Sequence, residues 1–433
     1  MKNKIFVPLL LVASSLLMAQ NSTKLTLEEA IEKGLANSKA IKFTEAGIQS
    51  AEAKSKSVKN NQLPDLSISG QYQQILSKGT TKIKLPIPTS ENSPFSTLSP
   101  DHVMLGTAGT SMPIFAGNKI NNSIKQSKLA IDVSKLQNDA TKEDVVWQVI
   151  NLYFGLYKTQ KTIDVLNENL ARAEQRVIDF KNFLDNGIIA KNDYLSAKLQ
   201  VSNVKIAIED ASNTYNNLNY RLNILIGNPT TEKHEIVYLK SKEINNSSES
   251  LTDRKDIQTL EKQTEIADKS IAIAKAGYYP QLAFTANYYA MDIDKIATIT
   301  NSITLGLGLK YDLSSLYKNK HEVNFAKAKK VENELQLEMV KDKARIEIYE
   351  AQQKYELADK KNKVYDEALQ QATENYRIVK DKYDNGLEDT DHLLEADVQQ
   401  LQAKINKVVG EADQDLAGYE YLYTQGKLIE NIQ

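Results

Sequence analysis

The sequence predicts an α+β membrane protein that is internally duplicated, with four strands per chain in a transmembrane sheet and long antiparallel coiled-coil helices. Three observations support this fold class. Two halves of the chain share glycine, proline and aromatic residues at nearly constant spacing. Each half contains a very long helical stretch with apolar residues at heptad spacing. Each half also contains two segments in which apolar residues alternate with small or polar ones.

The duplication extends over most of the chain. A repeat of this length that occurs twice indicates two copies of one large unit, and not a solenoid of many short units. The corresponding segments are 60–72 and 276–288, Leu184–Gly187 and Tyr383–Gly386, and Gly227 and Gly426.

The first 19 residues have the features of a secretory signal peptide. Lys2 and Lys4 precede an apolar stretch that ends at Met18, and Ala19 supplies a small residue at the expected cleavage site. The stretch is short for a membrane span, so a retained anchor is the less favoured alternative. The predicted regions are therefore a signal peptide over 1–19, a first repeat over 20–227, a linker over 228–251 and a second repeat over 252–433.

Composition excludes several functional classes. The sequence contains no cysteine, which excludes disulfides and thiol catalysis. A formal net charge of −2 offers no basic surplus for a nucleic acid. The histidines are far apart without metal-ligand spacing, and no glycine-rich phosphate loop occurs. We therefore predict no enzyme, no cofactor and no metal site.

Two uninterrupted helices are predicted over 118–185 and 319–384, each about 100 Å long at the usual rise per residue. Return helices follow over about 193–226 and 388–425, and leading helices over about 38–60 and 254–278 supply the length that the return helices lack. Apolar residues in the long and return helices alternate in steps of three and four, which predicts side-by-side packing. Examples are Ile163, Leu166, Leu170, Ala173, Val177, Phe180 and Leu184 in the first repeat, and Leu394, Val398, Leu401, Ile405, Val408 and Ala412 in the second.

Strands are predicted where the leading helices end. The alternation is clear over 282–290 and 303–311 and weaker over 66–72 and 103–112. Apolar residues on one side are typical of strands that face lipid. No later apolar run reaches the length of a transmembrane helix, so a closed barrel is the remaining way to span a bilayer. Four strands cannot close a barrel, and three copies would supply twelve.

Several motifs match one known family. The opening segment 25–31, followed by Asn37 and Ser38, is similar to the start of mature outer-membrane efflux proteins. Residues 274–282, with 254–256 upstream, are similar to their entry from helix to strand, and the two Asn-Gly reversals match their periplasmic turns. The sequence thus resembles the TolC-type outer membrane efflux protein family over essentially the whole mature chain. The resemblance implies a trimeric 12-stranded transmembrane β-barrel, continued by an α-helical periplasmic tunnel that narrows to a closable tip.

The resemblance also implies a function and its partners. The chain would be the outer-membrane exit duct of a tripartite efflux pump, passing small molecules passively to the exterior. Its partners would be two further copies, a periplasmic adaptor (membrane fusion) protein, an inner-membrane transporter and outer-membrane lipid. A type I protein secretion duct is an alternative. A secreted periplasmic coiled-coil scaffold without a pore would explain the heptads but not the paired strands. The sequence does not identify the exported substrate, because the adaptor and the pump select it.

Residues at the tip follow from the resemblance as well. Tyr383 fits the aromatic position of the second reversal, and Asp193 takes the acidic position of the first. These two residues would lock the closed tip, although Asp193 also fits an ordinary acid in the first turn of a helix. Glu388 stands where the best-known member has an arginine, so that link is absent or made differently.

Two inward-facing acids of that member correspond to His392 and Glu395. Three copies of Glu395 would form a carboxylate ring that gives cation preference. His392 would change the charge of that ring near its usual pKa of about 6.5. The alternatives are a solvated helix charge for Glu395 and a neutral exposed imidazole for His392.

Overall fold

The computed structural model describes residues 23–76, 100–238 and 251–432. The predicted signal peptide and residues 239–250 of the predicted linker lie outside the described residues. The described residues form two compact units: those of the first lie within Met1–Lys42, Ala140–Arg254 and Lys343–Gln433, and those of the second within Phe43–Asp139 and Lys255–Asp342. No helix among the described residues combines the length and apolar character needed to cross a membrane.

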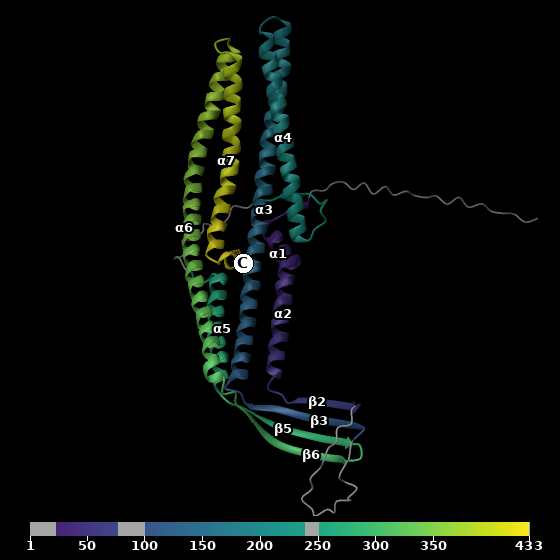
Figure 1. Cartoon of the computed structure of the whole chain (residues 1–433). Helices are drawn as coiled ribbons and strands as arrows, with labels where there is room; N and C mark the ends of the chain where they lie inside the picture. The colour runs from purple at the N-terminus through teal and green to yellow at the C-terminus, as the bar shows by residue number, and fades with distance from the viewer. Residues whose placement is uncertain (1–22, 77–99, 239–250, 433) are drawn as a thin grey trace, which may run out of the picture. The chain divides into compact units, whose positions relative to one another are not determined.

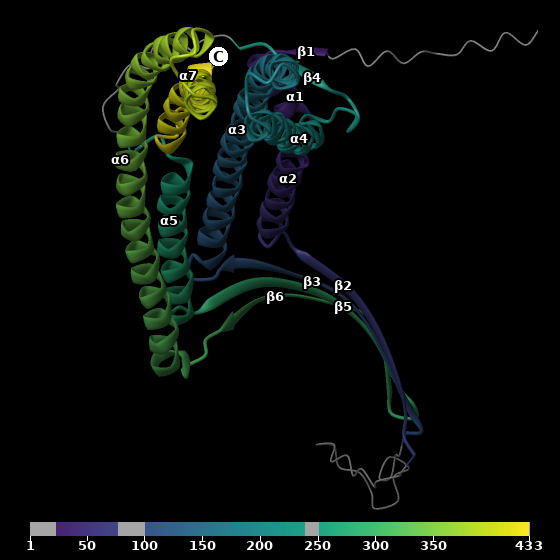
Figure 2. The ribbon, with the colours of Figure 1, turned by 90° about the horizontal axis from the view of Figure 1, so that it is seen from above.

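A four-stranded antiparallel sheet lies in the second unit (Figure 2). Its strands are β2 (Asp65–Gln74), β3 (His102–Phe115), β5 (Gln281–Ile293) and β6 (Ala297–Lys310). The order is β2-β3-β5-β6, so each repeat supplies one hairpin and β3 pairs with β5 across the repeats. The four predicted strands are confirmed, and β2 and β6 are the edges of the sheet.

The helices of the second unit stand beside one another above the strand ends. They are the later part of α2 (Lys39–Asn60), the first part of α3 (Lys119–Asp185), α5 (Lys255–Lys275) with the short η1 (Ala276–Tyr278), and the first part of α6 (Ser315–Asp384). Side-chain hydrogen bonds join neighbours, with Thr44 to Asn138 at 2.8 Å and Gln126 to Ser270 at 2.7 Å. The predicted long and leading helices are therefore confirmed, and α6 begins four residues earlier than predicted.

In the first unit, four helices form a row in the order α6, α7 (Thr390–Thr424), α3 and α4 (Lys191–Ile226) (Figure 1). Ion pairs cross each junction of the row: Lys407 to Asp366 at 2.6 Å, Lys158 to Asp413 at 2.7 Å and Lys205 to Glu174 at 2.8 Å. The predicted heptad residues of α3 are all buried or half-buried, as side-by-side packing requires.

The buried face of α7 is broader than the predicted stripe. Of the predicted residues, Ala412 is fully buried, only Val398 is exposed (43%), and the others are half-buried: Leu394, Leu401, Ile405 and Val408. Further buried residues lie one or two positions from the predicted ones, and most of them are small or polar. They include Leu393, Ala396, Asp397, Gln400 and Ala403. The reason is that α7 has neighbours on two sides: Lys407 pairs with Asp366 of α6, and the buried Asp397 pairs with Arg176 of α3.

A compact region that the sequence did not predict surrounds the middle of α3. Strand β1 (Thr23–Leu25) pairs in parallel with β4 (His234–Ile236), and the helices α1 (Leu27–Asn37) and α8 (Leu428–Ile432) pack against the same core. The hydroxyl of Tyr153 on α3 donates to the carbonyls of Leu25 (3.2 Å) and Val237 (2.6 Å). These hydrogen bonds join the start of the first repeat and the segment that follows α4 to the long helix α3.

Candidate functional site at the helix reversals

The two reversals of the long helices have the same backbone structure. Gly187 (φ 72°) ends α3, and Gly386 (φ 71°) ends α6. In each reversal the glycine N–H donates to the carbonyl of the residue three positions earlier (2.9 Å). The N–H of the residue after the glycine donates to the carbonyl of the residue five positions before it (2.8 and 2.9 Å). This is the Schellman motif, in which the left-handed residue is most easily a glycine. The matched Asn-Gly pairs of the sequence therefore end both helices in the same way.

A small apolar cluster lies directly below the reversals. Phe180, Ala197 and Leu393 are at most 4% exposed, and they come from α3, α4 and α7. Tyr383 of α6 stacks on Phe180 with 5.7 Å between the ring centroids. The half-buried members are Val177, Ile189, Tyr194, Tyr376, Val379 and Tyr383. All four helices of the row are therefore joined at this end.

Tyr383 lies in a charged environment as well as an apolar one. Burial raises the pKa of its hydroxyl, and the carboxylate of Asp193 adds to that rise. A hydrogen bond with Thr390 and the positive charge of Arg176 oppose the increase in this pKa. The carboxylate of Asp193 thus disfavours the ionised form of Tyr383.

Asp193 also has a local role. Its Oδ2 accepts a hydrogen bond from the N–H of Ala190 (3.1 Å), the residue that precedes α4. Ala190 has no side-chain acceptor, so Asp193 supplies the only side-chain hydrogen bond of a capping box here. The lock between Asp193 and Tyr383 remains a prediction, and the first-turn role of Asp193 is the one that the hydrogen bonds describe.

Glu388 and His392 form a pair at the start of α7. The imidazole Nδ1 lies 2.5 Å from Glu388 Oε1, and the Asp389 side chain caps the helix by accepting from the His392 N–H (2.9 Å). The bond to Glu388, together with the charges of Asp389 and Glu395, raises the pKa of His392 above 6.5. Glu388, which was predicted to leave the link at this position absent or differently made, thus contacts His392.

The same three residues could hold a metal ion. Donor atoms of Glu388, Asp389 and His392 lie within 4.8 Å of one another, which is a spacing that a divalent cation can bridge. Each residue already has a partner within the turn, and the side chains of Asp389 and His392 are more than half exposed. The prediction that the chain has no metal site stays a prediction.

Glu395 lies on the exposed side of α7, where its carboxylate accepts from Gln399 Nε2 (3.1 Å). It is one turn from His392, as the sequence places it, and its charge contributes to the raised pKa of that histidine. The carboxylate ring requires further copies of the chain and stays a prediction.

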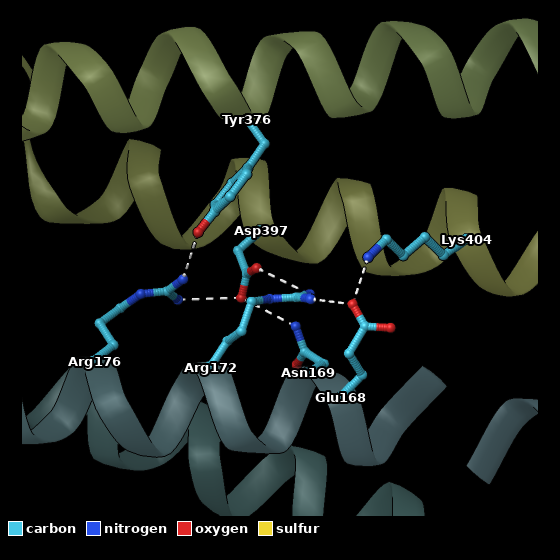
Figure 3. Close-up of polar contacts among 7 residues, drawn as sticks. All are labelled: Glu168, Asn169, Arg172, Arg176, Tyr376, Asp397 and Lys404. Carbon is cyan, nitrogen blue, oxygen red and sulfur yellow. Dashed lines mark hydrogen bonds and ion pairs between the residues drawn. The ribbon is translucent and has the colours of Figure 1, made fainter. Parts of the chain in front are cut away.

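A buried charge network further down the row was missed by sequence reasoning. Asp397 of α7 has a fully buried side chain, and its Oδ2 accepts from Arg176 Nη1 (3.1 Å) and Asn169 Nδ2 (3.2 Å), both on α3 (Figure 3). The second guanidinium nitrogen of Arg176 donates to the Tyr376 hydroxyl of α6 (3.2 Å). One arginine thus connects three helices.

A second, more exposed set of ion pairs lies next to the buried network. Arg172 Nη1 lies 2.7 Å from Glu168, and Lys404 of α7 reaches the same carboxylate at 2.9 Å. The ion pairs lower the pKa of Glu168, chiefly through the hydrogen bond from Lys404. The sequence did carry a signal for the network: Asn169 and Arg176 continue the three-four steps of Leu166, Ala173 and Phe180, and all five are buried.

Comparison with known proteins gives a consistent result. The sequence matches the family described as outer membrane efflux protein over residues 30–228 and 246–418. A comparison with curated proteins found no match.

Solved structures share the fold at low sequence identity. The Campylobacter jejuni CmeC outer membrane channel is 18% identical, with a TM-score of 0.80, covering 93% of this chain and 86% of that one. VceC of Vibrio cholerae is 16% identical (TM-score 0.77, coverage 92% and 96%). The open state of the Neisseria gonorrhoeae MtrE channel is 17% identical (TM-score 0.75, coverage 93% and 89%).

The family match covers most of both repeats, and the solved channels share the strand and helix plan described above. The predicted fold class, outer-membrane location and role in efflux are thereby confirmed. The chain belongs to the outer membrane efflux protein family.

Proposed function

We propose that the chain is a passive exit duct of a tripartite efflux pump, formed by three copies in the outer membrane and extending into the periplasm. It has no catalytic role, and the inner-membrane transporter supplies the energy and selects the cargo. The observation that carries this proposal is that the helix row of the first unit and the sheet of the second unit each have two uncovered edges. Each edge is suited to contact with another copy of the chain.

The helix row of the first unit has two such edges. On α4 the exposed apolar residues Leu195, Leu199 and Ile206 share one helix face, and on α6 the same holds for Ile346, Leu357 and Val364. All six are at least 50% exposed in the single chain. Because α4 and α6 are opposite ends of the row, the α4 edge of one copy can cover the α6 edge of the next. Such head-to-tail contacts form a ring when the rotation closes.

The sheet of the second unit supports the same assembly. Its edges, β2 and β6, carry unpaired backbone groups along 10 and 14 residues. Alternate residues of β6 are apolar and about 70% exposed, namely Ile303, Leu305, Leu307 and Leu309. Pairing β6 with β2 of the next copy would close a barrel with this apolar face toward lipid. Three copies would supply twelve strands, as predicted from the sequence.

The reversals are the proposed docking site for the periplasmic adaptor. Ile188 and Leu387 follow the two turn glycines at matched positions and are 67% and 77% exposed. Exposed apolar side chains at both tips favour a partner that presents apolar residues of its own.

Single-channel recording in planar bilayers tests the duct. Purified protein in detergent should insert and give discrete conductance steps, whereas a coiled-coil scaffold without a pore would give none. Absence of steps from protein that is folded and trimeric would contradict the proposal.

Loosening the tip should increase the conductance. Asp193→Ala and Tyr383→Phe each remove one side of the proposed lock, so both variants should conduct better than the unmodified channel. Tyr194→Phe, which removes a hydroxyl from the same apolar cluster, is the matched control. Equal conductance in all three variants and the parent would leave Asp193 and Tyr383 as capping and packing residues.

Ion selectivity should depend on Glu395 and, through pH, on His392. With Glu395 ionised and His392 neutral, the channel should prefer cations. Protonation of His392 adds positive charge, so the preference should weaken as pH falls through the pKa of this histidine. Because that pKa is raised above 6.5, the weakening should begin at a higher pH than for an isolated imidazole.

Reversal potentials across a salt gradient measure this selectivity. Glu395→Gln should lower the cation preference at neutral pH, and His392→Asn should remove much of the change between about pH 7.5 and about pH 5.5. Asp381→Asn removes the same charge from the exposed surface of α6 and is the control for Glu395→Gln. An unchanged reversal potential in Glu395→Gln would place the selectivity ring elsewhere.

A further inference from the structure

The two faces of the four-stranded sheet differ in chemistry. We call the face that carries Leu305 and Leu307 of β6 the outer face, because it would contact lipid in the proposed barrel, and the opposite face the inner face. The hydroxyls of Ser69 and Thr107 hydrogen-bond across the inner face (2.7 Å). Strand pairing places mainly hydroxyl and amide side chains on the inner face over the middle of the sheet, namely Ser67, Ser69, Thr107, Ser111, Thr285, Asn287, Ser302 and Thr304.

A β-bulge in β6 changes which of its residues face inward near the hairpin end of the sheet. Two steps along β5, from Tyr289 to Met291, correspond to three steps along β6, and Met291 opposes Ile299. Asn301, within this stretch, has a left-handed backbone with φ 60°. An extra residue reverses the alternation of the strand beyond it. Ile299 therefore lies on the inner face with Met291, whereas regular alternation would have placed it on the outer face with Ile303.

Beyond the bulge the inner face is apolar on three neighbouring strands. Val103 of β3 opposes Ile293 of β5, Leu105 opposes Met291, and Met291 opposes Ile299 of β6. Side chains that oppose each other on one face are in contact range. These five residues form one continuous patch, which we call the apolar collar.

The outer face at the same level is polar. The Thr298 hydroxyl lies 2.6 Å from Asp292 Oδ1, and His102 Nε2 lies 3.7 Å from the same carboxylate. The ring of Tyr72 stacks on His102 with 5.8 Å between centroids. Since lipid-facing strands are apolar, these side chains mark the level at which the strands would leave the bilayer core.

In the proposed assembly the apolar collar would border water in the outer mouth of the duct. Barrel diameter grows with strand number, and twelve strands enclose more space than their inward side chains fill. An apolar patch that faces water marks a contact site for another molecule. The surroundings of the collar indicate the charge of that molecule.

Acidic residues predominate at the strand ends beyond the collar. Lys295 Nζ lies 2.6 Å from Asp101 and 3.5 Å from Asp294. Two carboxylates and one ammonium group leave one net negative charge per copy at this hairpin end. A ligand that complements the collar and this charge has an apolar body and a positive charge.

We propose that the apolar collar is a binding site for amphipathic organic cations at the outer mouth, which such cargo contacts as it leaves the duct. This inference rests on the proposed function, since the inner face encloses a mouth only when several copies close the barrel. It assigns a cargo-binding site to the sheet, far along the chain from the helix reversals, and it names the chemical class of the cargo.

Equilibrium binding tests the collar without any need for conduction. The chain has no cysteine, so Gln71→Cys places a polarity-sensitive fluorophore on β2, directly opposite Leu105. Trimers in lipid nanodiscs, free of detergent that would itself fill an apolar site, are titrated with hexyltrimethylammonium. The emission should shift saturably. Tetramethylammonium, which lacks the apolar chain, should bind about tenfold more weakly, and hexanesulfonate, which has the chain but a negative charge, should also bind more weakly.

Substitutions in the collar should weaken binding selectively. The double variant Leu105→Ser with Met291→Ser should lower the affinity for hexyltrimethylammonium by about tenfold, because the chain loses its apolar contacts. Met104→Ser removes an apolar side chain from the outer face next to Leu105, so it is the matched control and should bind as the parent does. Ile299→Ser, at a 43% exposed position, gives the same test with a smaller change if the double variant does not assemble.

Several outcomes overturn the collar. It fails if the labelled parent gives no saturable shift, if the collar variants bind as tightly as the parent, or if Met104→Ser weakens binding equally. Binding of hexanesulfonate as tight as that of hexyltrimethylammonium would overturn the assigned charge of the cargo. The duct is tested separately: trimers that bind the cation but give no conductance steps would reject the duct alone, and conducting trimers that do not bind it would reject the collar alone.

Discussion

The unmodified chain is expected to run as a trimer in detergent, and Val364→Lys as a monomer. Val364 is 59% exposed on the apolar face of α6, so a lysine there disturbs no packing within the chain. In the proposed ring, however, the same side chain is covered by α4 of the next copy. Burying an unpaired ammonium group costs several kcal/mol per ion, and the ring would bury three of them. Size-exclusion chromatography with light scattering measures the mass directly.

Two further variants make this test specific. Ile206→Lys places the same charge on the opposite edge of the row, on α4, and should also give monomers. Gln370→Lys adds the charge to an exposed position on a different face of α6 and should leave the trimer intact. Trimers of normal stability in both Val364→Lys and Ile206→Lys would contradict the proposed α4–α6 contact.

Gly227→Ala is expected to destabilise the chain far more than Gly187→Ala. Both glycines end a helix with a left-handed backbone, φ 77° and 72°, so alanine costs about 1–2 kcal/mol at either. At Gly227 the added Cβ would also lie 2.8 Å from Cβ of Asn37, whose side chain is held by a 2.8 Å hydrogen bond to the Ile226 carbonyl. Overpacking of this kind adds about 1–3 kcal/mol.

Gly187 is the matched control because its added Cβ would meet nothing within 4 Å. Thermal unfolding in detergent, followed by circular dichroism, should therefore show a clearly larger loss of stability for Gly227→Ala. Equal losses would mean that Asn37 moves aside at little cost and that the backbone strain alone sets the effect.

The secondary structure was accessible from the sequence because its signals are local. Apolar residues at heptad spacing predicted the extent of α3 and α6. Alternation of apolar with small or polar residues predicted β5 and β6, and the two Asn-Gly pairs predicted the positions of both reversals. Each signal depends on residues within a few turns or strand positions of one another. The same local motifs, repeated in order in two halves, were enough to identify the family.

Long-range features were not accessible, since no local pattern encodes them. Strands β1 and β4 are three residues each and pair across more than two hundred positions. Gly187 and Gly227 look alike as turn glycines, yet only Gly227 is packed against Asn37.

The candidate site shows the same division. Sequence alone placed Asp193, Tyr383, Glu388, His392 and Glu395 near the reversals, since each is counted from a turn glycine. It did not show that Glu388 bonds His392, or that Asp397, two residues from Glu395, is fully buried. The periodicity of apolar residues in a helix predicts which residues share a face. Which face is buried depends on the position of the neighbouring helix. Only the tertiary structure shows that α3 packs against α7. In the sequence Arg176 and Asp397 are two separate helix charges, and this packing makes them an ion pair.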